Sequence, residues 1–216
     1  MVVLALAAVL LGILLPVIGR AREAGRRTRC AANLAGIGKA FAAYASEHKG
    51  FVPRGATYAQ PRFPLWVAVL QPYLRGRAAD NWSDISATPA LQCPSHPTPG
   101  IPTAFVVNAF AFETAPAWRQ SAATAVGGIR NPANLPFVLE TPDQFKKRSY
   151  VVFDDIFFEI FHVIHDPAHL PGSPEPRVSF VRHGRMSNVL YLDGHVDVVR
   201  PGGLALDDFD DGLRNR

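Results

Sequence analysis

The chain has 216 residues, of which 48% are hydrophobic and 19% charged, a composition that excludes an intrinsically disordered protein. Its net charge of +4 is accounted for by one segment, residues 20–29, with five arginines and one glutamate. A basic cluster that directly follows an apolar run is typical of contact with lipid headgroups, and no basic or aromatic motif indicates nucleic-acid binding. Two cysteines are too few for a disulfide framework or for a zinc site made of thiolates alone.

The first 18 residues, MVVLALAAVLLGILLPVI, carry no charge. As a helix they would be about 27 Å long, close to the hydrocarbon thickness of a bilayer. A fully apolar run of this length is rare in the core of a soluble domain. A cleaved signal peptide would have basic residues before the run and a small-residue cleavage site after it, whereas here the basic residues follow. We therefore predict a transmembrane half-helix over residues 1–19.

Two features inside this run bear on assembly. Pro16 has no backbone N–H, so the carbonyl of Gly12 loses its helical partner and the helix has a local weak point there. Ala5, Ala8 and Gly12 share one helical face, and such small side chains allow close helix–helix approach in lipid. The composition leaves two interpretations open: an assembly helix, or a monomeric anchor with an incidental kink.

The helical pattern continues beyond the membrane. Apolar or aromatic residues recur every three or four positions, which predicts one continuous helical stripe over residues 20–49; its members are Cys30, Leu34, Ile37, Phe41, Tyr44 and His48. Gly50 is a suitable C-terminal stop, and Pro53 disfavours continuation. We expect this amphipathic half to pack along a globular domain of residues 50–216.

That domain is rich in proline, which predicts many short elements joined by turns. In chain order we predict a short helix over residues 63–74 that ends at Pro72, strands over 103–112 and 135–141, an ambiguous segment at 150–164 (strand then helix, or an extended hairpin), and a strand over 177–182.

The clearest local pattern is a β-hairpin around residues 188–199. Its strands are NVLYL and HVDVV, and Asp193-Gly194 between them favours a two-residue type I′ turn. The acidic end that follows is predicted to be a solvated tail.

Metal sites are only weakly indicated. His162, His165 and His169 have helical spacing, but Pro167 would break that helix, so we favour loop histidines. The acidic end, including Asp207 and Asp208, could offer oxygen ligands to calcium, although a solvated end is favoured.

His183 and Asp193 lie at opposite ends of one predicted strand, which argues against a shared site. No phosphate loop or nucleophile motif occurs, so we predict neither an enzyme nor a bound cofactor.

Several segments together resemble a family of pilin-like proteins, abundant in planctomycete-type bacteria, that carry a prepilin-type C-terminal motif. The motif, His, nine residues, then Asp-Gly, is matched by His183, Asp193 and Gly194. The N-terminal rod matches independently, and two central positions also fit; the matched residues are Pro16, Arg20-Ala21-Arg22-Glu23, Cys30, Asn33-Leu34, Ile37-Gly38, Cys93-Pro94 and Asn108, with Phe105 in place of a family tyrosine.

The resemblance implies an α+β fold in which a long helix packs on a small antiparallel sheet, as in type IV pilins and type II secretion pseudopilins. It implies a subunit without enzymatic activity that waits in the inner membrane with its domain in the periplasm. A prepilin peptidase would trim and methylate it, and a secretion platform would assemble it with its like and with other pilin-like subunits. It also implies a Cys30–Cys93 disulfide, because both residues occupy matched motif positions in an oxidising compartment.

Two points depart from the family pattern. Family members carry a leader with a glycine and then usually Phe-Thr-Leu-x-Glu, and none of this precedes Val2, so we expect the leader to be missing from this chain. The basic segment after the apolar run would place the domain in the cytoplasm by the positive-inside rule, against the resemblance.

The alternative to a filament subunit is a membrane-tethered ligand- or metal-binding domain that does not polymerise.

Overall fold

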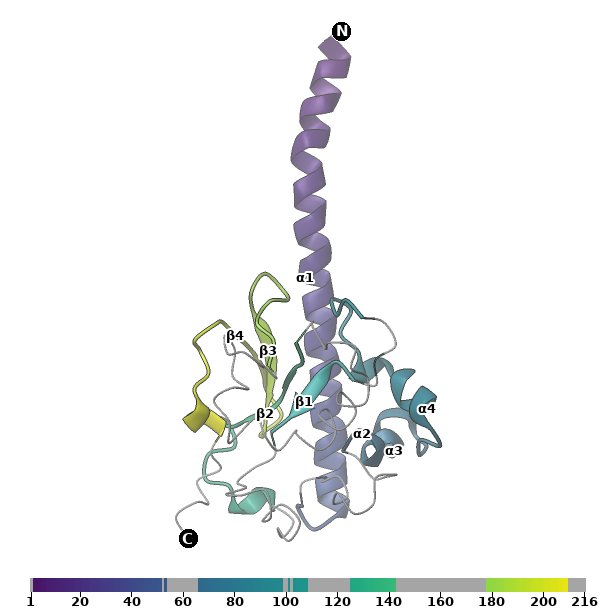
Figure 1. Ribbon diagram of the computed structural model, residues 1–216, viewed down its shortest axis with the longest axis vertical. Helices are drawn as coiled ribbons and strands as arrows, with labels where there is room; N and C mark the ends of the chain where they lie inside the picture. The colour runs from purple at the N-terminus through teal and green to yellow at the C-terminus, as the bar shows by residue number, and fades with distance from the viewer. Residues whose placement is uncertain are drawn as a thin grey trace.

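The computed structural model describes residues 2–51, 53, 66–98, 101, 103–108, 125–142 and 178–209. A single long helix, α1 (Val2–Glu47), projects from a small domain built around a four-stranded antiparallel sheet (Figure 1). The predicted α+β class, with a long N-terminal helix packed on a small antiparallel sheet, is confirmed. The ambiguous segment at 150–164 lies outside the described residues.

Helix α1 is continuous through Gly12 and Pro16, so the predicted weak point does not interrupt it. It ends where the sequence predicts. Lys49 and Gly50 both have positive φ, 56° and 77°, and the N–H of Gly50 donates to the carbonyl of Ala45 at 2.7 Å. This left-handed exit satisfies the last carbonyls of the helix.

The two halves of α1 have opposite environments. Residues 2–22 are exposed along their whole length, whereas the later half contributes a buried stripe of Cys30, Leu34, Ile37, Gly38, Ala40 and Phe41. Phe41 packs on Phe137 of the sheet, with ring centroids 4.5 Å apart. Each large apolar side chain buried in this way stabilises the fold by about 1.5–3 kcal/mol. The predicted stripe is confirmed up to Tyr44, while His48 is exposed and stacks on Tyr44.

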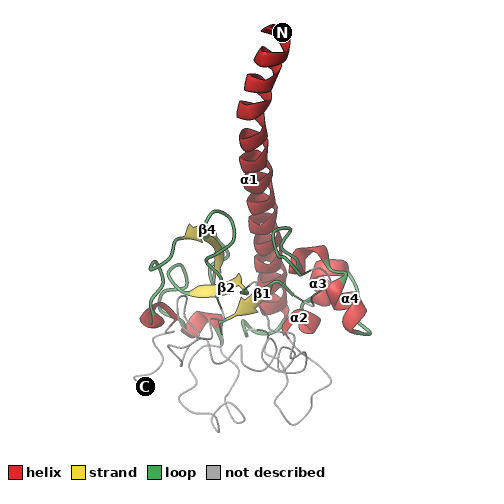
Figure 2. Ribbon diagram, turned by 45° about the horizontal axis from the view of Figure 1, so that its top comes forward, coloured by secondary structure: helices red, strands yellow, loops and turns green. Residues whose placement is uncertain are grey.

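The sheet has the order β1-β2-β3-β4, with every neighbouring pair antiparallel. Its strands are β1 (Phe105–Val107), β2 (Pro136–Glu140), β3 (Ser187–Tyr191) and β4 (Val196–Val199). The first two confirm the strands predicted at 103–112 and 135–141, with shorter bounds. The β2–β3 register shifts between Pro136 and Val138. Figure 2 shows the sheet on one side of α1 and the short helices of residues 66–86 on the other.

The hairpin of β3 and β4 is confirmed, but its predicted two-residue turn is wrong. Gly194 has φ 97°, and Asp193 is not among the residues with positive φ. The N–H of Gly194 donates to the carbonyl of Tyr191 at 3.0 Å, and the N–H of Tyr191 donates to the carbonyl of His195 at 2.9 Å. A wider loop with one left-handed glycine therefore replaces a type I′ turn. The Asp193 carboxylate, which accepts from the N–H of His195 at 3.0 Å, stabilises it.

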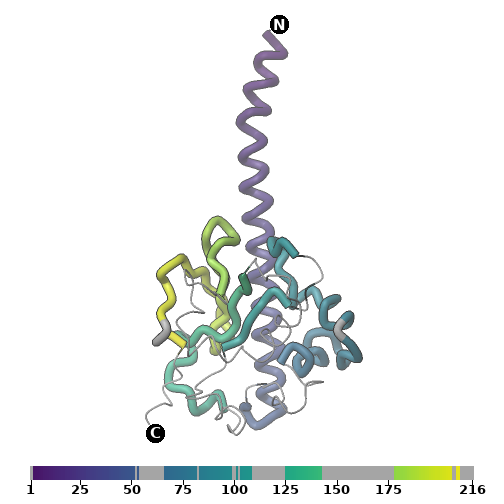
Figure 3. The backbone as a smooth tube through the Cα atoms, viewed as in Figure 1, coloured from purple at the N-terminus to yellow at the C-terminus, as the bar shows by residue number. Residues whose placement is uncertain are grey.

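The helix predicted over 63–74 is two helices in the described part of that segment, α2 (Trp66–Val69) and α3 (Gln71–Arg75). Pro72 starts α3 instead of ending a helix, because a proline in the first turn removes only an N–H that has no helical partner. The chain continues through α4 (Trp82–Ser86) and the 3₁₀ turn η1 (Pro89–Leu91). In Figure 3 residues 66–98 lie on one side of α1 and residues 178–209 on the other.

Two further predictions are corrected. The segment predicted as a strand over 177–182 forms no strand in its described residues 178–182. Ser179 donates its N–H to the Glu140 carbonyl at 2.9 Å. The chain then turns through His183, Gly184 and Arg185, whose positive φ values do not allow a β-strand to continue. The acidic end is not simply a solvated tail, since Phe209 in η6 (Leu206–Phe209) is fully buried and its carbonyl accepts from Asn108.

Helix α1 approaches the sheet closely at Gly38, where an added Cβ would lie 2.9 Å from Cδ1 of the fully buried Leu190. We expect Gly38→Val to lower the free energy of unfolding by about 1–3 kcal/mol through overpacking. The matched control is Gly36→Val, because an added Cβ at Gly36 meets nothing within 4 Å in the part of the chain that the structure describes. Its effect should stay within about 0.5 kcal/mol. Urea denaturation of the full chain in detergent measures both; equal effects would contradict the close approach.

Candidate functional site

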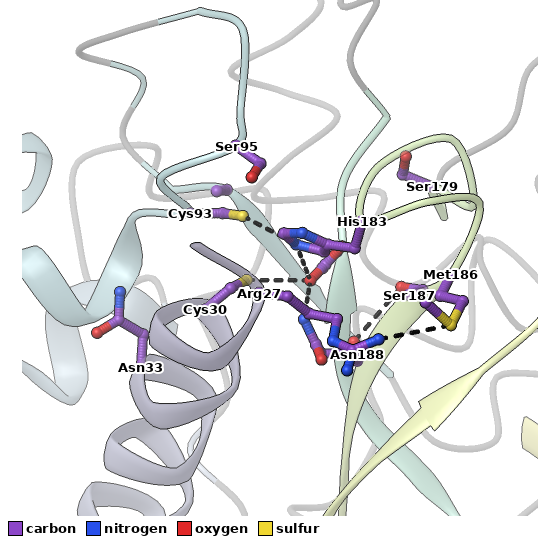
Figure 4. Close-up of polar contacts among 12 residues, drawn as sticks. Arg27, Cys30, Asn33, Cys93, Ser95, Ser179, His183, Met186, Ser187 and Asn188 are labelled. Atoms are coloured by element: carbon purple, nitrogen blue, oxygen red, sulfur yellow. Dashed lines mark hydrogen bonds and ion pairs between the residues drawn. The ribbon is translucent and has the colours of Figure 1, made fainter. Parts of the chain in front are cut away.

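Four buried side chains from distant parts of the sequence meet beside α1, and we call them the buried cluster: Cys30, Cys93, Glu140 and His183. Cys30 is on α1, Cys93 follows η1, Glu140 is the last residue of β2, and His183 lies in the turn before β3. Their sulfur, nitrogen and oxygen ligand atoms all lie within 4.8 Å of one another. Figure 4 shows the two cysteines and His183 converging on one point.

Short contacts link all four members of the buried cluster. Cys30 Sγ donates to Oε1 of Glu140 at 3.0 Å, and Cys93 Sγ lies 3.4 Å from Nε2 of His183. Nε2 of His183 is in turn 3.2 Å from the same Glu140 oxygen. The side chains of Glu140 and His183 have no exposed surface. A buried ion pair of this kind is stabilised by hydrogen bonds to its remaining polar atoms.

Three outer residues orient the buried cluster. On α1, Glu23 accepts at Oε1 from the Ser95 hydroxyl at 2.7 Å and lies 2.9 Å from Nδ1 of His183. On β3, Asn188 donates its side-chain amide to Oε1 of Glu140 at 2.8 Å. The histidine ring is thus held at both nitrogens, and the carboxylate is held from the sheet.

The local backbone explains how His183 is presented. His183, Gly184 and Arg185 have consecutive positive φ values of 53°, 73° and 67°. Such a left-handed run is unfavourable for residues with a side chain and persists where surrounding contacts fix it. The run is closed by the N–H of Met186, which donates to the Arg182 carbonyl at 3.0 Å. The turn therefore points the imidazole inward just before β3 begins.

The loop that carries Cys93 is tied directly to α1. The Asn33 side-chain amide donates to the carbonyls of Pro89 and Gln92, at 3.0 and 2.6 Å. These bonds hold both ends of η1 against the helix and place Cys93 one residue beyond the second of them. A side chain donating to two loop carbonyls is an efficient way to position a loop that lacks a regular ladder.

Electrostatics favour charged groups in the buried cluster. Burial lowers the pKa of His183, but hydrogen bonds to Cys93 and Glu140 outweigh it and raise this pKa to about 10. A hydrogen bond from Cys30 lowers the pKa of Cys93 to about 5, against the effect of burial. Burial raises the pKa of Glu140, yet the His183 hydrogen bond and charge and the positive charge of Arg182 lower it overall. These shifts favour the ionised forms of His183, Cys93 and Glu140, whereas the hydrogen bond with Cys93 raises the pKa of the Cys30 thiol.

Both cysteines are free thiols in the structure. Their sulfur atoms nevertheless lie within 4.8 Å of each other, so the fold brings together the two residues that the resemblance pairs. The Cys30–Cys93 disulfide itself stays a prediction.

The sequence-predicted site residues are placed as follows. His183 joins the buried cluster, whereas Asp193 and Gly194 lie in the hairpin turn at the far end of β3, which agrees with the expectation that they share no site. There Asp193 Oδ1 is 2.6 Å from Nδ1 of His195. Asp208 is exposed and accepts from the N–H of Ala205. His162, His165 and His169 lie outside the described residues, as does the side chain of Asp207.

Sequence patterns did not identify Glu140, Ser95 and Asn188 as site residues, and they indicated Glu23 only as a matched family position. Glu140 is the one acidic residue in the apolar run LPFVLET. A charged residue that ends a fully buried strand is a signal in itself, because such groups are buried only when paired or coordinated. The four residues proposed for assembly, Ala5, Ala8, Gly12 and Pro16, all lie in the exposed half of α1.

The Asn33 anchor predicts a stability effect. Asn33→Ala removes two hydrogen bonds and should lower the free energy of unfolding by about 1–3 kcal/mol. Asn131→Ala, at an exposed position of the β1–β2 side of the domain, serves as control and should be nearly neutral. Denaturant titration of the full chain in detergent gives both values; an Asn33→Ala variant as stable as the control would show that these bonds hold nothing in place.

Comparison with known proteins adds one match. A family model described as a protein of unknown function, DUF1559 (SBP_bac_10), matches residues 19–135, more than half of the chain. No curated protein matches. No solved structure matches either. The matched region contains Glu23, Cys30, Asn33 and Cys93. The chain therefore belongs to the DUF1559 family, a family of planctomycete-type pilin-like proteins.

Proposed function

We propose that this protein is a structural subunit, held in the inner membrane by α1, that assembles into a type II secretion or type IV pilus-type filament. The observation that carries the proposal is the division of one unbroken helix into an exposed apolar half and a half that forms the core of the domain. A simple tether needs no such continuity. Here any force or packing at the apolar half acts directly on the folded domain.

The exposed half has the dimensions of a membrane span. Residues 2–18 rise about 26 Å as a helix, near the thickness of the hydrocarbon layer. Their large apolar side chains are 43% exposed or more; they are Val2, Val3, Leu4, Leu6, Val9, Leu10, Leu11, Ile13, Leu14, Leu15, Val17 and Ile18. So much exposed apolar surface is unfavourable in water and favourable in lipid. The arginines that follow in residues 20–29 would lie at the headgroups.

Assembly is supported by the small-residue face and by family membership. In lipid, apolar helices gain little from hydrophobic burial against each other, so close packing at small residues favours association. Ala5, Ala8 and Gly12 supply such a face, and Pro16 leaves the Gly12 carbonyl without its helical donor. A locally weakened helix can unwind where subunits must pack. Prepilin peptidase, a secretion platform and other pilin-like subunits are the partners that this function would require.

The buried cluster favours a second candidate function, a membrane-tethered metal-binding domain that does not polymerise. Its members are typical metal-ligand types and lie within 4.8 Å of one another. Metal binding and polymerisation are compatible in one subunit, so polymerisation alone separates the two candidates.

The first test is cross-linking in cells that express the full-length gene product. Ala5→Cys and Ala8→Cys should give cross-linked dimers and higher oligomers, because both positions lie on the small-residue face. Leu10→Cys, on the opposite face, is the matched control and should cross-link much less. Cys30 and Cys93 are buried, so the unmodified protein should give no cross-linked species. Monomers from every variant, in protein that stays in the membrane after carbonate extraction, would favour the non-polymerising domain.

Orientation is a separate prediction. We expect the domain to face the periplasm, so alkaline phosphatase fused after Arg216 of the full-length gene product should be active in cells. Green fluorescent protein at the same position, exported in an unfolded state, should be dark. The opposite pair of results would place the domain in the cytoplasm, as the positive-inside rule alone predicts.

A further inference from the structure

We propose that Cys30, Cys93, Glu140 and His183 together bind one zinc-type divalent metal ion in a closed tetrahedral site. The proposal rests on geometry: four donors of metal-ligand type, two sulfurs, one nitrogen and one oxygen, come from four separate segments and converge on one buried point (Figure 4). This site does not depend on the proposed filament function.

The donor spacing fits a tetrahedron. With ligand distances of about 2.3 Å to sulfur and about 2.0–2.2 Å to nitrogen and oxygen, the edges of a zinc tetrahedron are about 3.3–3.8 Å long. The three donor pairs measured in the buried cluster are 3.0, 3.2 and 3.4 Å apart. Each of these pairs would need to open by at most about 0.7 Å, and the other three pairs, which lie within 4.8 Å, would need to close by at most about 1.3 Å.

The outer contacts are those of a metal site. A metal-binding histidine commonly has its second ring nitrogen bonded to a carboxylate, which fixes the tautomer and the ring. Nδ1 of His183 has this partner in Glu23, at 2.9 Å, and Ser95 holds Glu23 in turn. With Nδ1 so occupied, Nε2 is directed at the two sulfurs and the carboxylate. Asn188 likewise holds the Glu140 oxygen that faces the other donors.

Two polar atoms at the site, Oε2 of Glu140 and Oδ1 of Asn188, have unused bonding capacity in the described part of the chain. Oε2 of Glu140 is buried and, in the described part of the chain, has no hydrogen-bond partner. A buried carboxylate oxygen without a partner is costly. A metal ion bound to this carboxylate would compensate for that cost by neutralising charge on both oxygens.

The ion would have a structural role. All four coordination positions are filled by protein side chains that are buried, which is typical of structural zinc and unlike catalytic zinc with its open position. Mixed sulfur and imidazole donors select a borderline-soft ion such as zinc over magnesium or calcium. The ion would link α1, the loop after η1, the end of β2 and the turn before β3. A Cys30–Cys93 disulfide would use the same sulfurs, so the two states exclude each other.

The test uses the full chain in detergent, purified with reductant, stripped with chelator and titrated with cobalt(II). We expect one equivalent of cobalt with the intense visible bands of tetrahedral thiolate coordination, displaced by one equivalent of zinc. Cys30→Ser, Cys93→Ser and His183→Ala should lose stoichiometric binding. Glu23→Ala should keep the stoichiometry but weaken affinity about 10–100-fold. The matched control is His195→Ala, an exposed histidine paired with Asp193, which should bind as the unmodified protein does.

Three results would overturn the proposal. One is an unmodified, folded and reduced protein that binds no cobalt or zinc. Another is binding that is unchanged in the cysteine and His183 variants. The third is a Cys30–Cys93 disulfide, with no metal present, in protein taken directly from its native membrane and analysed by mass spectrometry without reductant.

Discussion

The structure depends on the burial of one face of α1 against the sheet and the short helices. From Cys30 to Phe41 this face is the central element of the core, with η1 and α3 on one side and β3 and β4 on the other. Gly38 permits a close approach to the sheet, with Leu190 filling the space that a side chain would take. Because the sheet has only four short strands, it could not bury a sufficient core without the helix. The second half of α1 is therefore part of the domain.

This dependence explains the position of the buried cluster. Cys30 is the first buried residue of α1 along the chain, and residues 2–22 before it are exposed. The cluster thus lies where the helix enters the domain. At this junction Glu23 contacts Ser95 and His183, and Cys30 contacts Glu140. These side-chain contacts join α1 to three segments with which the helix shares no backbone hydrogen-bond ladder. A mechanical load on the apolar half would reach the domain first at this junction.

The contrast within α1 also constrains function. The early half presents exposed apolar side chains and a face of small residues. The late half buries its apolar stripe in the core of the domain. Both surfaces belong to one helix that is continuous through Gly12 and Pro16. Membership of a pilin-like family agrees with this arrangement, while filament assembly remains the proposal that cross-linking tests.

Local patterns in the sequence determined the long helix, its end at Gly50, the strands around residues 105 and 138 and the hairpin, because these follow from periodicity and turn chemistry among near neighbours. Tertiary structure decided what those patterns could not. It placed Pro72 at the start of a helix, widened the turn at Asp193, buried Phe209 and left residues 178–182 without a strand. Above all, it assembled the buried cluster. In the sequence, Cys93 was named as a motif member and as the expected disulfide partner of Cys30, His183 was weighed only with Asp193, and Glu140 was not identified as a site residue. Their partnership arises from contacts between residues 90 and 110 positions apart, and spacing along a chain carries no information about such contacts until the core has packed.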